Sequence, residues 1–132
     1  MVESPAMLKN IRQLDYTIVL CDDLPRMKAF YRGLFDFRVA SETPTTLSME
    51  AGSVNFCLRK RTRAYDGKSA GPGSPGVQIA FRVPPGNVDP CHAELLRQGV
   101  TILDPPKDQE WGHRTLYFSD PEGNILEIYE EL

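Results

Sequence analysis

Residues 111–130, WGHRTLYFSDPEGNILEIYE, restrict the possible fold more than any other part of this chain. Residues 114–119 are rich in aromatic and threonine side chains, which is typical of a half-buried β-strand. The sequence DPEGN at 120–124 then supplies turn-forming residues, including Gly123, which adopts left-handed backbone conformations at no steric cost. After this turn, residues 125–129 are again mostly apolar. The segment therefore predicts two antiparallel strands joined by a tight turn.

Glu127 interrupts the apolar pattern of the second of these strands. Alternation along a strand places Ile125, Glu127 and Tyr129 on one face, and Leu126 and Ile128 on the other. A carboxylate in such a strand is either a surface residue or part of a pocket, and residues 111–130 alone leave both interpretations open.

Composition restricts the class of protein and its partners. The chain has 132 residues, 41% hydrophobic and 25% charged, as expected for a single soluble globular domain. A formal charge of −3 gives no reason to expect nucleic acid, and no apolar run approaches a membrane span or a signal peptide. Three widely separated cysteines do not suggest a disulfide framework or a zinc site. We therefore expect a cytoplasmic protein that binds small molecules or other proteins.

The order of predicted elements occurs twice along the chain. After a frayed leader at 1–10, the first module spans 11–60. Its elements are a strand at 14–21, a helix that begins at 22–25, and strands at 37–40, 46–50 and 53–59. Residues 61–76 are rich in glycine, proline and serine, which predicts a mobile linker or loop.

The second module spans 77–132 and repeats this order. It begins with a strand at 77–83, followed by a helix that carries Val88 and Leu95 and ends at Gly99. A strand at 100–103 and a polar loop at 104–110 lead into the hairpin of residues 111–130. The two modules together predict an α+β domain with one strand, one helix and three strands in each half.

Aligning the two modules pairs four side chains. Residues 16–21 (YTIVLC) fall on 78–83 (QIAFRV), and 50–60 (EAGSVNFCLRK) fall on 121–131 (PEGNILEIYEE). This alignment pairs Tyr16 with Gln78 and Phe56 with Glu127. Because the match is one of pattern more than of identity, the four positions are candidates for a shared site.

The chain resembles the vicinal oxygen chelate superfamily, which includes glyoxalase I, bleomycin-resistance proteins and extradiol dioxygenases. The resemblance covers about residues 12–131. It is carried by LDYTIVLCDDLPRMKAFYRGLFDFRV, VQIAFRV and WGHRTLYFSDPEGNILEIYE. It implies two βαβββ modules whose mixed sheets curl into a shared cleft, usually in a homodimer. Some relatives exchange modules between chains, and this alternative stays open.

The resemblance also indicates which residues would bind a metal cofactor if this chain had one. In metal-using members the ligands are histidine and glutamate at the four aligned positions, which hold Tyr16, Phe56, Gln78 and Glu127 in this chain. Of these, only Glu127 is a strong ligand for a divalent metal, and Phe56 cannot bind one. We therefore expect no metal cofactor, with a weakly held divalent metal at Glu127 as the alternative.

Two functions follow from the resemblance. The first is binding of a small organic molecule, without a catalytic metal, in an aromatic-lined cleft. The expected ligand-binding residues are Tyr16, Phe56, Gln78, Trp111, His113 and Glu127. The second is a lyase or isomerase in which Glu127 is the base and Tyr16 or His113 the acid; dioxygenase-type activity is a further alternative. Internal hydrogen bonds, core packing or a position at the rim would equally explain these residues.

Overall fold

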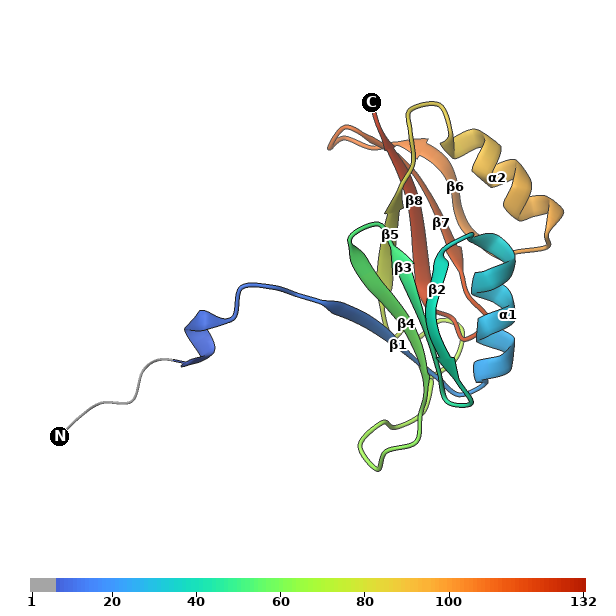
Figure 1. Cartoon of the computed structure of the whole chain (residues 1–132). Coiled ribbons are helices and arrows are strands. Elements are labelled where there is room, and N and C mark those ends of the chain that lie inside the picture. The colour runs from blue at the N-terminus through green and yellow to red at the C-terminus, as the bar shows by residue number, and fades with distance from the viewer. Residues whose placement is uncertain (1–6) are drawn as a thin grey trace.

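The computed structural model describes residues 7–132 and consists of two βαβββ modules (Figure 1). A 3₁₀ turn, η1 (Met7–Asn10), precedes them. The first module contains β1 (Tyr16–Cys21), α1 (Leu24–Leu34), β2 (Arg38–Thr43), β3 (Thr46–Ala51) and β4 (Val54–Lys60). The second contains β5 (Gln78–Arg82), α2 (Val88–Arg97), β6 (Ile102–Asp108), β7 (His113–Ser119) and β8 (Ile125–Glu131). The predicted α+β order is confirmed; residues 1–6 of the predicted leader lie outside the described residues.

Each module forms its own four-stranded mixed sheet. The strand orders are β1-β4-β3-β2 and β5-β8-β7-β6, so β1 and β5 are edge strands. Each of these edge strands runs parallel to its neighbour, and all other pairs are antiparallel. Both helices lie on the same side of the molecule in Figure 1. None of the helices within residues 7–132 is long and apolar enough to cross a membrane.

Strand β6 differs from the prediction of a polar loop at 104–110. It continues to Asp108 and includes Pro105 and Pro106. The strand tolerates both prolines because it forms the edge of its sheet, and its pairing with β7 shifts register on both sides of Asp104. The loop prediction was therefore wrong for most of its length.

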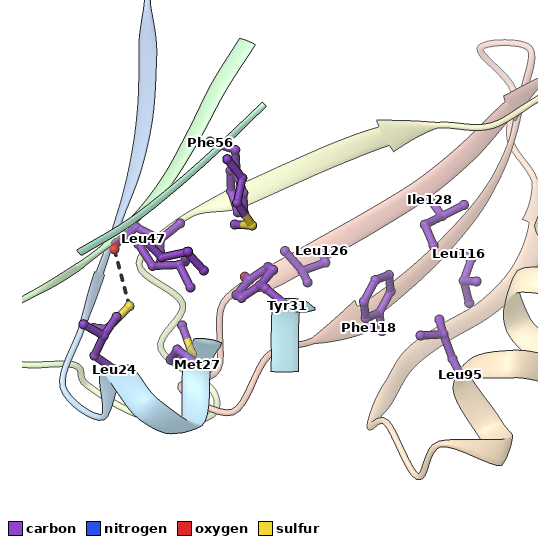
Figure 2. Close-up of a cluster of buried hydrophobic side chains, with 14 of the residues drawn as sticks. Leu24, Met27, Tyr31, Leu47, Phe56, Leu95, Leu116, Phe118, Leu126 and Ile128 are labelled. Carbon is purple, nitrogen blue, oxygen red and sulfur yellow. Dashed lines mark hydrogen bonds between the residues drawn. The ribbon is translucent and has the colours of Figure 1, made fainter. Parts of the chain in front are cut away.

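The hydrophobic core joins the two modules. Met27 and Tyr31 of α1 are fully buried, as are Leu116 and Phe118 of β7. Figure 2 shows Tyr31 beside Leu126, between the side chains of the first module and those under α2. The two sheets thus share one core on their helix-bearing faces.

The loop at 61–76 is anchored to the body at several points. Asp66 is buried, and its carboxylate accepts two hydrogen bonds from the Arg59 guanidinium, at 2.8 and 2.9 Å. It also accepts the backbone N–H groups of Thr62 and Arg63, each at 2.8 Å. The bonds from Arg59 hold the pKa of Asp66 well below its usual range. The segment is irregular, as predicted, but these bonds fix its first part.

The turn at 120–124 binds the first module to the second. Tyr31 Oη donates a hydrogen bond to Asp120 Oδ2 at 2.7 Å, while Asp120 Oδ1 accepts the backbone N–H groups of Glu122 and Asn124. Gly123 has a φ of +86°, and a Cβ there would lie 2.8 Å from the Gly71 carbonyl oxygen. The turn therefore requires glycine both for its conformation and for its contact with the loop at 61–76.

A glutamate side chain of the second module binds the backbone at the start of each helix. The Glu122 carboxylate accepts the backbone N–H groups of Asp22 and Asp23, at 2.8 and 2.9 Å, immediately before α1. The Glu130 carboxylate accepts those of Gly86 and Val88 at the start of α2. Such contacts satisfy N–H groups that have no partner inside a helix.

Replacing Tyr31 with phenylalanine should lower the free energy of unfolding by about 1–3 kcal/mol, because Asp120 loses a buried charge-assisted hydrogen bond. Urea unfolding of Tyr31→Phe measures this loss. Tyr65→Phe is the matched control, since that tyrosine is 79% exposed. Equal stability of the two variants would contradict the role assigned to the Tyr31–Asp120 bond.

Candidate functional site

Glu127 lies on the face of the second sheet that carries no helix. Its neighbours Leu126 and Ile128 are buried in the core, so alternation directs Glu127 to the opposite face. It is nevertheless only 8% exposed. Gln78 Nε2 donates a hydrogen bond to Glu127 Oε1 at 3.3 Å. Two of the predicted site residues are therefore in contact.

Tyr117 is a third member of this cluster, and the sequence analysis missed it. The antiparallel register of β7 and β8 pairs Tyr117 directly with Glu127. Burial, together with the negative charge of Glu127, raises the pKa of the Tyr117 phenol. The phenol therefore stays protonated at neutral pH. The tight turn at 120–124 fixes this register, so the pairing was available from the sequence.

His113 lies on the same face as this pairing, further along the hairpin, whereas Trp111 lies outside the strands. The His113 ring stacks on Tyr129, with ring centroids 4.3 Å apart and the rings 20° from parallel. Trp111 lies between β6 and β7 and is 61% exposed. In a single copy of the chain, Trp111 therefore does not form the pocket wall that the sequence suggested.

The predicted pairing of Phe56 with Glu127 was wrong by one residue. Along the parallel strands, Tyr16 pairs with Asn55 in the first module and Gln78 with Ile125 in the second. Cys57 lies two residues after Asn55, and Glu127 lies two residues after Ile125. Cys57 and Glu127 are therefore the equivalent positions. Phe56 faces the core instead, where its ring lies 5.3 Å from that of Tyr31. The error arose because the alignment placed Gly52 on Gly123, although Cys57 lies one residue further from its glycine than Glu127 does.

The helix-free face of the first sheet carries Tyr16, Ile18 and Cys57. Tyr16 is 53% exposed and Ile18 47% exposed, whereas Cys57 is buried next to Ser48, with Sγ and Oγ 3.2 Å apart. Tyr16 thus belongs to a different sheet from Gln78 and Glu127. The structure brings Gln78 together with Glu127 but does not bring Tyr16 to them.

With Cys57 in place of Phe56, the side chains at the four equivalent positions do not fit a catalytic metal within one copy. They are a phenol (Tyr16), a thiol (Cys57), an amide (Gln78) and a carboxylate (Glu127), divided between two sheets. Only the carboxylate is a strong ligand for a hard divalent ion, and the Cys57 thiol, which could bind zinc as a thiolate, lies on the other sheet from Glu127. Within residues 7–132, no three histidine, cysteine, aspartate or glutamate side chains gather closely enough to hold a metal ion.

A separate groove of about 480 Å³ lies at the junction of the modules. It is bordered by the end of α1, by β5 and by α2. Its apolar lining includes Leu34, Phe35, Phe37, Phe81, Val83 and Cys91. None of the six predicted ligand-binding residues lines this groove.

One protein family matches most of the chain. Residues 13–128 match the model of the Glyoxalase/Bleomycin resistance protein/Dioxygenase superfamily. An uncharacterised protein of Bacillus subtilis is 27% identical, over 92% of this chain and 98% of its own. A virulence protein of Salmonella typhimurium is 19% identical, over 89% of this chain and 83% of its own.

Solved structures show the same fold. A glyoxalase/bleomycin resistance protein/dioxygenase from Nocardioides has a TM-score of 0.79 and 22% identity, covering 96% of this chain and 89% of its own. A lactoylglutathione lyase from Agrobacterium tumefaciens has a TM-score of 0.72 and 20% identity, covering 92% and 95%. At these identities the likeness establishes the fold alone.

Replacing Glu127 with glutamine should lower the pKa of Tyr117 towards that of a free phenol, because the negative charge beside it is removed. NMR titration of the tyrosine ring carbons measures this shift, with the Tyr117 signal assigned from Tyr117→Phe. Glu110→Gln, which alters an exposed carboxylate, should leave the Tyr117 signal unchanged. An unchanged pKa in Glu127→Gln would show that the two side chains are not in contact.

Proposed function

Because the chain belongs to the glyoxalase/bleomycin resistance protein/dioxygenase superfamily, we propose that it binds a small organic molecule at Glu127 without a catalytic metal. The observation that carries this proposal is a glutamate residue that is only 8% exposed on a sheet face that no helix covers. A buried carboxylate is costly unless a partner satisfies it. A ligand with hydroxyl or ammonium groups would be such a partner.

The hydrogen-bonding capacity of the cluster supports a ligand of this class. A carboxylate has about four acceptor sites, and Gln78 occupies one at 3.3 Å. The protonated Tyr117 phenol adds a donor on one side, and the stacked rings of His113 and Tyr129 lie on the same face of β7 and β8. Together they favour a hydroxylated or cationic molecule with a flat apolar part.

Two copies of the chain form the functional unit in this proposal. Tyr16 and Ile18 expose large apolar surfaces on the edge strand of the first sheet. A second copy would cover this face and place Tyr16 and Cys57 opposite a Glu127 cluster. The three free cysteines favour a reducing compartment such as the cytoplasm.

The same cluster supports a second candidate function, a lyase or isomerase. Glu127 would remove a proton next to a carbonyl group, and the Tyr117 phenol would donate a proton to the developing oxyanion. The observation that favours this candidate is the direct pairing of a carboxylate with a phenol whose pKa is raised. Tyr117 replaces Tyr16 and His113 as the acid because it is paired with Glu127.

Thermal-shift measurements with metal-free bleomycin, dopamine and menadione test ligand binding. At least one of these compounds should raise the melting temperature, since a ligand at 100 times its Kd adds about 2.7 kcal/mol of stability. The shift should disappear in Glu127→Gln and persist in Glu110→Gln. A shift that survives Glu127→Gln would place the ligand elsewhere on the protein.

Metal analysis of protein purified without chelators tests the metal-free site. Zinc, nickel and iron should each remain far below one atom per chain, and EDTA should leave the melting temperature unchanged. One equivalent of metal that is lost in both Glu127→Gln and Cys57→Ser would overturn this part of the proposal. Such a result would instead identify the two side chains as metal ligands contributed by the two sheets.

A further inference from the structure

The segment before β1 carries a run of apolar side chains that nothing covers. Met7, Leu8, Ile11 and Leu14 are 66%, 83%, 68% and 86% exposed. Figure 1 shows this segment projecting away from the rest of the molecule. We call residues 7–14 the arm. Large apolar side chains gathered on one exposed segment indicate a binding surface.

The groove at the junction of the modules offers a complementary surface. It is lined by Phe35, Phe37 and Phe81, and it follows the edge strand β5 through Arg82 to Val83. No strand within residues 7–132 pairs with the outer edge of β5. Residues 11–14, which follow η1 and are not helical, can therefore hydrogen-bond to this edge while their side chains enter the groove.

We propose that the arm of one copy of this chain binds in the groove of a second copy, along the open edge of β5. The arm supplies apolar side chains for the apolar lining, and its Lys9 and Arg12 can meet Glu94 in the groove. The one cation of the lining within residues 7–132, Arg82, is already ion-paired with Glu131 at 3.4 Å. The arm cannot bind its own groove in the conformation shown, because Figure 1 places it on the opposite side of the molecule from α2.

A two-fold pair of such contacts would bury both arms at once. Each copy donates one arm and accepts one, which closes the dimer and leaves no free groove for a third copy. The inference rests on the dimer that forms part of the proposed function. It does not depend on a ligand at Glu127, so the thermal-shift experiment and the assembly experiments test separate claims.

The first experiment measures assembly by sedimentation velocity over a range of concentrations. Wild-type protein should form a dimer, and a double variant, Leu8→Asp with Ile11→Asp, should dissociate at least tenfold more readily. Leu96→Asp is the matched control, because Leu96 is 56% exposed on α2 and does not line the groove. A monomeric wild type, or a double variant that dimerises as tightly as wild type, would overturn the proposal.

The second experiment locates the arm by using Cys91, a natural thiol in the groove. Leu8→Cys and Ile11→Cys proteins are oxidised with copper phenanthroline as mixtures of isotopically labelled and unlabelled chains. At least one of them should form a disulfide with Cys91 between labelled and unlabelled chains, identified by mass spectrometry. The link should be absent in Cys91→Ser. Links confined within one chain, or a dimer without any link to Cys91, would overturn this placement of the arm.

Discussion

The fold depends on the carboxylates of the turn between β7 and β8. Asp120 holds the Tyr31 phenol at 2.7 Å, and Glu122 holds the backbone at the start of α1 at 2.8 and 2.9 Å. The helix of the first module is thus fixed at its start and along its buried face by residues of the second. Phe56 and Phe81, from different sheets, then meet with ring centroids 6.2 Å apart and complete a common core.

Burying the helix-bearing faces in a common core leaves the other two faces for binding. On the second sheet this face carries Glu127, Gln78 and Tyr117, whose polar groups are satisfied partly by one another. On the first sheet it carries Tyr16 and Cys57. The helix-free surface is divided between two sheets. The proposed ligand site is therefore complete only in the proposed dimer. A second copy can bring the two halves together, whereas one copy keeps them apart.

The sequence predicted the elements well where local signals were strong. Asp23 caps α1, Pro25 lies in its first turn, and Gly123 adopts the positive φ that the turn requires. It failed where tertiary context decides the outcome. Pro105 and Pro106 are typical of a loop, yet they belong to an edge strand, where the backbone N–H groups that proline lacks are not needed for pairing.

The candidate site was predicted only in part. Glu127 and Gln78 were both among the four positions that the module alignment assigned to a shared site, and the structure brings these two into contact. Phe56 was misassigned because the alignment placed Gly52 on Gly123, although Cys57 lies one residue further from its glycine than Glu127 does. A shift of one residue exchanges the two faces of a strand, and the pairing with β1 shows that Cys57 is the equivalent residue.

The two helices acquire their N-terminal partners at different times during synthesis. Glu130 lies in the same module as α2, so that helix and its cap emerge from the ribosome close together. The Glu122 carboxylate, which binds the backbone immediately before α1, is translated 100 residues after Asp22. The first module therefore leaves the ribosome with the local Asp23 cap of α1 but without the contacts from Glu122 and Asp120, which the last hairpin supplies. Although it is made first, the first half of this chain is completed last.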